Sequence, residues 1–104
     1  MAEFLYVTTT GWKTGKPHEI EIWYVEHKGH YYIVSEHRER SHWVQNIQHN
    51  PAITVRVGDE TFSGTGRVVD ASETDLVAAV AQKMDAKYQW SDGLIVELRR
   101  GESA

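Results

Sequence analysis

A short polar segment near the beginning of the chain has the residue types that bind an anion. The range 8–16 reads TTTGWKTGK and combines threonine hydroxyls, two glycines that permit a positive φ, and the positive charges of Lys13 and Lys16. A phosphate group would fit such a loop. The same residues also fit an ordinary hairpin turn whose lysines only keep it in contact with water, so the surrounding segments have to decide between the two.

Strands are predicted on both sides of this loop. Phe4 to Thr10 is apolar and β-branched, and His18 to Glu26 alternates charged with apolar residues. After a turn signal at His27 to Gly29, His30 to Ser35 reads as a third strand rich in aromatic and β-branched residues. The three strands are predicted to form a meander.

A short helix is predicted to follow the third strand. Its apolar residues recur at helical spacing and an Asn-Pro pair ends it: Trp43, Val44, Ile47, Asn50 and Pro51. Ser41 is predicted to lie near the N-cap, with Arg38 and Arg40 just before that end. Because anions favour the amino end of a helix, this corner is a second place that suits a negatively charged ligand.

A hairpin is predicted after this helix. It spans Ala52 to Val57 and Thr61 to Val69, with a tight turn at Gly58. Gly64 and Gly66 lie inside its second strand and indicate a bulge or a close approach of another backbone. Small closed barrels need such bends.

A long helix and a final strand complete the prediction. The helix spans Glu73 to Lys87, with Ser72 as its cap and an apolar face made of Leu76, Val77, Val80 and Met84. Gly93 to Leu98 reads as the final strand, and the tail from Arg99 is expected to be frayed.

The predicted order of elements is β-β-β-α-β-β-α-β, so the chain is mainly β with two helices. Six short strands and two helices favour an antiparallel barrel over a doubly wound sheet, which needs alternating strands and helices. The 104 residues are expected to form a single domain spanning 1–104 with a small core. A homodimer or a bound cofactor is therefore an expected source of additional stability.

Composition excludes several classes of function. The chain has no cysteine, which excludes disulfides, thiolate nucleophiles and cysteine-bound metals. A net charge of −4 argues against a general nucleic-acid-binding protein. No stretch approaches the roughly 20 apolar residues of a membrane span, and the amino terminus does not read as a signal peptide. We expect a cytoplasmic protein with no nucleic-acid partner and no membrane span.

Two further chemistries are weakly supported. The six histidines include the pairs His27 with His30 and His37 with His42, but these pairs flank turns and loops, so no metal site is predicted. No serine lies in a Gly-x-Ser-x-Gly elbow, so no catalytic triad is expected. The aromatic residues are predicted to fill the core or an interface, except Trp12, which lies in a polar loop and is expected to cover a ligand or a partner subunit.

Two segments of the chain resemble the deazaflavin-dependent nitroreductase family, within the pyridoxamine phosphate oxidase-like superfamily of split β-barrel oxidoreductases. The first is TTTGWKTGKP at Thr8 to Pro17, which is similar to the family's entry loop. The second is HWVQNIQHNPAITVRV, which is similar to the family in Trp43, Asn46, Ile47, Asn50 and Pro51. Asp92 to Leu98 resembles the closing strand. The resemblance therefore covers most of the chain and implies a six-stranded antiparallel split β-barrel of the FMN-binding type.

The resemblance also implies an oxidoreductase. Members bind coenzyme F420 in a groove that a dimer partner often borders, and they transfer a hydride to a small acceptor such as a quinone or a nitroaromatic. Because the chemistry belongs to the cofactor, no catalytic residue is expected. Lys13 is implied as the principal anchor of the cofactor's phosphate or acidic tail. Thr14 and the backbone N–H groups of Gly11 and Gly15 are implied as hydrogen-bond donors beside it.

The other implied cofactor-binding positions lie along the strands and the short helix. They are Trp12 and His18 in and after the loop, Ile20, Glu21 and Ile22 near the ring system, Ser35, Arg38 and Arg40 on the opposite wall, and Trp43 along the ring or the substrate pocket.

The chain departs from the family's pattern at two positions. Trp12 and His18 stand where the family has arginine, and a neutral histidine does not replace a guanidinium group. Fewer cations suit a less anionic ligand, so FMN is an alternative cofactor. A barrel that carries or senses a flavin, haem or another small ligand without turnover is a second alternative.

Overall fold

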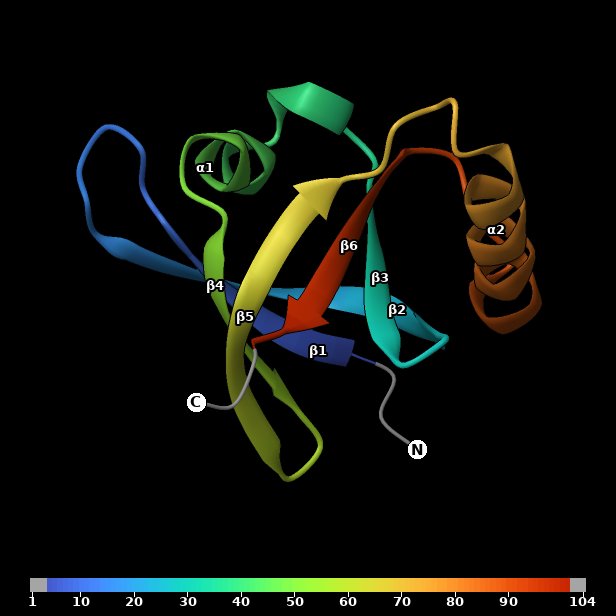
Figure 1. Cartoon of the computed structure of the whole chain (residues 1–104), viewed down its shortest axis with the longest axis horizontal. Helices are drawn as coiled ribbons and strands as arrows, with labels where there is room; N and C mark the ends of the chain where they lie inside the picture. Colours follow the sequence, from blue (N-terminus) through green and yellow to red (C-terminus); the bar gives the residue numbers. More distant parts are fainter. Residues whose placement is uncertain (1–3, 102–104) are drawn as a thin grey trace.

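The six strands form a closed antiparallel barrel (Figure 1). The computed structural model describes residues 4–101. Around the barrel the strands follow the order β1-β2-β3-β6-β5-β4. The elements along the chain are β1 (Phe4–Thr10), β2 (Pro17–His27), β3 (His30–Ser35), the single 3₁₀ turn η1 (Arg38–Arg40), α1 (His42–His49), β4 (Ala52–Val57), β5 (Glu60–Val68), α2 (Thr74–Tyr88) and β6 (Leu94–Arg100). The predicted fold class and the predicted order of strands and helices are confirmed.

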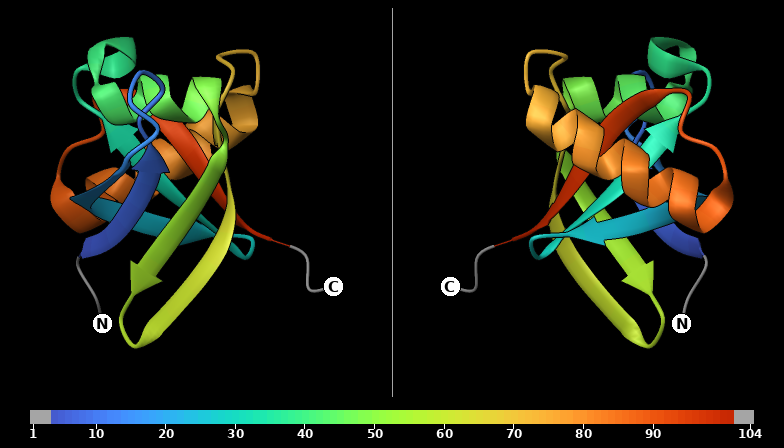
Figure 2. Two further views of the ribbon diagram at one scale, coloured as in Figure 1. Left: turned by 90° about the vertical axis from the view of Figure 1, so that its left-hand side faces the viewer. Right: turned by 90° about the vertical axis from the view of Figure 1, so that its right-hand side faces the viewer.

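The two helices cover different parts of the barrel. Val44 and Ile47 of α1 belong to the apolar cluster inside the barrel, together with Leu5 and Val96. Helix α2 lies across the outside of the barrel wall (Figure 2), where Val80 and Met84 pack in a second cluster that includes residues of β2, β3 and β6. Helix α1 therefore closes one end of the barrel, whereas α2 covers its side.

Strand β2 changes partners along its length. Pro17–Trp23 pair with β1, whereas Tyr24–His27 pair with β3. In the described part of the chain, the first half of β2 thus has a strand partner on one edge only. The loop between β1 and β2 extends away from the barrel beside α1 (Figure 1). This half-paired strand is the split in the barrel, and it positions the site described below.

The close approach predicted at Gly64 is confirmed. A Cβ atom at this position would lie 1.8 Å from the carbonyl oxygen of Arg99 on the neighbouring strand. The expectation of a frayed tail from Arg99 is wrong at its start, because Arg99 pairs with Thr65 and Arg100 pairs with Gly64. The rest of the predicted tail, from residue 102 onward, lies outside the described residues.

The predicted helix caps differ from those observed. Helix α2 has Glu73 as its N-cap residue rather than Ser72. The Glu73 carboxylate accepts hydrogen bonds from Arg67, at 2.9 Å, and from the backbone of Asp70. Ser41 is the N-cap residue of α1 as predicted, but its side chain makes no capping hydrogen bond. No helix within residues 4–101 is long and apolar enough to cross a membrane.

Candidate active site

A groove follows the half-paired part of β2 and consists of two adjoining hollows. The loop-side hollow has a volume of about 690 Å³ and is lined by Gly11, Trp12, Lys13, Thr14, His18, Glu19, Ile20, His37, Ser41, His42, Trp43, Gln45 and Asn46. The aromatic hollow has a volume of about 560 Å³ and is lined by Phe4, Glu21, Ile22, Trp23, Val34, Ser35, Glu36, His37, Ser41, Trp43, Met84 and Trp90. The two share His37, Ser41 and Trp43, so they form one continuous groove.

The loop that begins the groove is held by its own backbone. The N–H of Gly11 donates to the carbonyl of Lys16 at 2.8 Å, and the N–H of Gly15 donates to the carbonyl of Gly11 at 2.7 Å. The implied role of these two N–H groups as ligand donors is therefore wrong, because both are already satisfied. Within residues 4–101, the N–H groups of Lys13 and Thr14 have no acceptor and are the ones that remain for a ligand.

The two loop glycines are needed for different reasons. Gly15 has a φ of 73°, a left-handed conformation that favours glycine, as predicted. Gly11, which would also permit a positive φ, does not have one. A Cβ atom on Gly11 would lie 2.7 Å from Oγ1 of Thr14 and 2.9 Å from Nε2 of His18. Gly11 is thus required by close packing inside the loop.

Asn46 of α1 joins the helix to the loop. It is 5% exposed, its Oδ1 accepts from the N–H of Trp12 at 3.1 Å, and its Nδ2 donates to Oγ1 of Thr9 at 3.0 Å. Sequence reasoning quoted Asn46 in a motif but gave it no role. The available signal was an amide between Val44 and Ile47 on the buried side of a short amphipathic helix.

Trp12 and Lys13 form a stack with α1. The Trp12 ring lies parallel to the His49 ring, with 4.3 Å between their centroids and 9° between their planes. The Lys13 ammonium lies 4.9 Å from the Trp12 ring centroid, within the range of a cation–π contact. Trp12 therefore has a stacking contact within its own chain and stays 43% exposed at the hollow. That it covers a ligand or a partner subunit remains a prediction.

The wall opposite β2 differs from the implied one. Ser35 lines the aromatic hollow, but its hydroxyl donates to the carbonyl of Arg38 at 2.9 Å and accepts from the hydroxyl of Ser41 at 2.7 Å. Arg38 and Arg40 line neither hollow, and Gly15 also lies outside both. Arg38 forms an ion pair with Asp92 at 3.2 Å instead. The η1 turn thus directs Arg38 away from the groove, and His37 occupies the corner.

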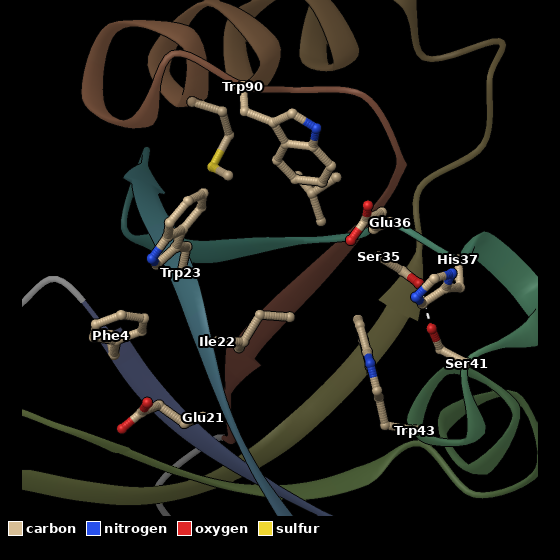
Figure 3. A pocket seen from close by; sticks show the side chains of 12 residues that line it. Phe4, Glu21, Ile22, Trp23, Ser35, Glu36, His37, Ser41, Trp43 and Trp90 are labelled. Atoms are coloured by element: carbon tan, nitrogen blue, oxygen red, sulfur yellow. Dashed lines mark hydrogen bonds between the residues drawn. The ribbon is translucent and has the colours of Figure 1, made fainter.

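Aromatic rings surround the far end of the groove (Figure 3). The Trp23 ring stacks on Tyr88 with 4.5 Å between centroids, and Trp90 meets Trp23 edge-on at 6.5 Å. Phe4 lies on the other side of Trp23, also at 6.5 Å. Ile22 lies between Trp23 and Trp43 in this view. The sequence analysis assigned these aromatic residues to the core or an interface. It could not predict that they form one hollow, because they come from segments between β1 and the loop after α2 that only the fold brings together.

The two hollows carry opposite charges. Lys13 lines the loop-side hollow, where the carboxylate of Glu19 is paired with Arg56 at 3.5 Å. Glu21 and Glu36 line the aromatic hollow, and no lysine or arginine does. Glu21 accepts a hydrogen bond from the hydroxyl of the half-buried Tyr6, which raises the pKa of that tyrosine. Within residues 4–101, no group of three or more His, Asp or Glu side chains could hold a metal ion.

A family model described as F420H(2)-dependent quinone reductase matches residues 1–93. The chain belongs to this family. The predicted relationship to deazaflavin-dependent split-barrel oxidoreductases is thereby confirmed, and the predicted coenzyme F420 is confirmed as the family's cofactor. None of the curated proteins compared with the chain matches it.

Solved structures confirm the split-barrel fold of this F420H2-dependent quinone reductase family member. The F420-H2-dependent reductase FDR-A is 24% identical, with a TM-score of 0.68, over 93% of this chain and 94% of that chain. The haem storage protein HutZ from Vibrio cholerae is 15% identical, with a TM-score of 0.78, over 97% and 83%. A Listeria innocua protein provisionally assigned as a pyridoxamine 5′-phosphate oxidase is 11% identical, with a TM-score of 0.75, over 96% and 85%.

The donors of the loop-side hollow fit the phosphate of the family's cofactor. Lys13 supplies one positive charge, and the free N–H groups of Lys13 and Thr14 lie in the same turn. Charge-assisted hydrogen bonds of this kind are the strong ones for phosphate. The walls that continue from this hollow, at Ile20, Ile22 and Trp43, are apolar and suit a flat ring system.

Proposed function

We propose that the protein reduces a small quinone-type acceptor with coenzyme F420 bound along the groove. The observation that carries this proposal is the division of the groove into a cationic, donor-rich end at the loop and an apolar, aromatic end beneath Trp23 and Trp90. An anionic cofactor with a planar ring needs both kinds of surface. The family to which the chain belongs supports the cofactor and the class of acceptor.

When bound, the reduced cofactor supplies a hydride, which is two electrons and one proton. A quinone that accepts the hydride becomes a hydroquinone anion and takes a second proton from water, so the cofactor is oxidised and the acceptor is reduced by two electrons. Lys13 and the adjoining N–H groups would hold the cofactor's phosphate, while Ile20 and Ile22 would hold its ring against the strand. No residue of the chain needs to form a covalent bond.

The test of the cofactor site compares two lysines of the same loop. Lys13 lines the loop-side hollow and Lys16 does not. Lys13→Ala is expected to weaken F420 binding by about 1.5–3 kcal/mol, because it removes a charge-assisted hydrogen bond. Lys16→Ala removes the same charge from the same loop and is expected to leave the dissociation constant unchanged. Fluorescence titration with F420 measures both, and equal losses would contradict the assignment.

The same titration distinguishes the alternatives. FMN in place of F420 tests the second cofactor, and tight binding of FMN with weak binding of F420 would overturn the proposal. The oxidation of reduced F420 with quinones and nitroaromatics, with and without protein, tests the enzyme. Binding without acceleration would indicate a carrier or sensor, for which the likeness to HutZ offers a common fold and nothing more.

A homodimer, a single domain and a cytoplasmic location complete the proposal. The small core of a 104-residue chain supports the dimer, because association buries further apolar surface. Sedimentation measures the oligomeric state, and a monomer at the concentrations used for the binding titration would overturn that part.

A further inference from the structure

The aromatic hollow combines rings with negative charge. Phe4, Trp23, Trp43 and Trp90 line it together with Glu21 and Glu36. The faces of aromatic rings carry partial negative charge and attract cations, most strongly when the site is shielded from water. No lysine or arginine lines the hollow, and His37 is the one basic side chain among its described lining residues, so the two carboxylates and the rings favour positive charge.

Glu36 is the carboxylate that is free to act on a ligand. Its side chain lies between Trp90 and Ser35 and points into the hollow (Figure 3). In the part of the chain that the structure describes, Glu36 has neither an ion pair nor a hydrogen bond through its side chain. Arg38, two residues along, is held by Asp92, whereas Glu21 already accepts a hydrogen bond from Tyr6. Glu21 keeps its charge, because the Tyr6 hydroxyl is neutral, but Glu36 is the carboxylate of this hollow whose oxygens no other described residue engages.

We propose that Glu36 is a specificity-determining residue that makes the aromatic hollow select planar acceptors by charge, favouring cationic over anionic ones. The inference rests on the proposed function, because it takes the aromatic hollow as the place where the acceptor binds. An acceptor with a positive substituent is attracted by Glu36 and by the rings. A negative substituent is repelled by Glu36 and loses its hydration among apolar side chains.

The test uses three naphthoquinones with the same core: one neutral, one with a sulfonate and one with a trimethylammonium group. Quenching of tryptophan fluorescence in the F420-loaded protein gives a dissociation constant for each without turnover. We expect the cationic quinone to bind most tightly and the sulfonate most weakly. Attraction and repulsion at an exposed carboxylate each change affinity a few-fold, so Glu36→Gln is expected to reduce the cation-to-anion ratio about ten-fold.

Glu39→Gln is the matched control. Glu39 lies three residues after Glu36 on η1 and lines neither hollow. The Glu39→Gln variant removes the same charge from the chain as Glu36→Gln. It is expected to leave the ratio unchanged. The effect of Glu36→Gln is also expected to shrink as salt is raised, because salt screens exposed charges. A merely structural role of Glu36 would weaken all three quinones alike and would not respond to salt in this way.

The outcomes separate this inference from the proposed function. The role of Glu36 would be overturned by equal dissociation constants for the three quinones, by equal effects of Glu36→Gln and Glu39→Gln, or by no quinone binding at all. Reduction of all three quinones at similar rates would leave the reductase standing and remove the selectivity. Charge-ordered binding without oxidation of reduced F420 would support the role of Glu36 and overturn the proposed reductase.

Discussion

Two of the buried polar side chains within residues 4–101 lie in different settings, one on α1 and one on β6 beside α2. Asn46, under the loop at the α1 end, is neutral and makes two hydrogen bonds. Glu97, on the wall beside α2, is charged and accepts from Tyr32 at 2.6 Å, Arg67 at 2.9 Å and Arg99 at 2.7 Å. The comparison shows that neutral hydrogen bonds shape the ligand loop at the α1 end. Charge-assisted hydrogen bonds hold the barrel strands together on the α2 side.

Arg67 extends the Glu97 cluster to the second helix. Its guanidinium group also binds both carboxylate oxygens of Glu73, the N-cap residue of α2, at 2.9 Å each. Arg67 and Glu73 are partly exposed, but Glu97 is only 2% exposed. The cluster thus ties β3, β5, β6 and the start of α2 together without touching the groove.

Removing the carboxylate of Glu97 is expected to have the largest effect on stability. Glu97→Ala leaves the Arg99 guanidinium group and the buried Tyr32 hydroxyl without their acceptor and leaves Arg67 with Glu73 alone. The loss of these charge-assisted hydrogen bonds costs about 2–3 kcal/mol. Urea denaturation measures this change. F420 affinity of the folded protein is expected to stay unchanged, and a stable variant with weakened F420 binding would break the comparison.

Acid is expected to have the next largest effect, again through Glu97. Burial alone would raise the pKa of Glu97, but hydrogen bonds from Arg67, Tyr32 and Arg99 outweigh it and lower the pKa to about 2. A folded-state pKa below the unfolded value means that the carboxylate stabilises the fold above the unfolded pKa of about 4.5 and loses this contribution as pH falls toward 2.

The measurement for acid is the free energy of unfolding as a function of pH. It is expected to decline from about pH 4.5 downward in the natural chain, and the decline is expected to be shallower in Glu97→Gln. Glu60→Gln serves as the control, because Glu60 is exposed and its pKa is lowered by the surface residue Arg100. An equal flattening in both variants would assign the acid response to surface charge.

Asn46→Ala is expected to have the smallest effect on stability and a clear effect on binding. It leaves the N–H of Trp12 and the hydroxyl of Thr9 without a partner, which costs about 1–2 kcal/mol. Because the loop then loses its tie to α1, F420 affinity is expected to fall about ten-fold. Equilibrium unfolding and F420 titration measure the two effects. Unchanged affinity together with a large loss of stability would make Asn46 a fold residue like Glu97.

The strands and helices could be predicted because each has a local signal in its composition or its periodicity. The apolar, β-branched run of β1, the alternation in β2 and the helical spacing in α1 are local properties, and the loop glycines and lysines were visible as a group. The direction of Arg38 could not be predicted, since it depends on Asp92 in the loop before β6. The same holds for the Trp23–Trp90 contact and for Glu97, whose partners lie on β3 and β5 as well as β6.

The half-paired strand limits how this protein could change during evolution. In β2, Glu19 and Glu21 alternate with Ile20 and Ile22, and all four border the groove. One residue inserted or deleted between Pro17 and Trp23 would exchange carboxylates for isoleucines along the groove, because a single-residue shift turns each side chain to the other face. The same change of length in the loop before Pro17 leaves that alternation intact. It would, however, break the backbone hydrogen bonds that hold Lys13 and Thr14 in place, so we expect related chains to change both the loop and the strand by substitution.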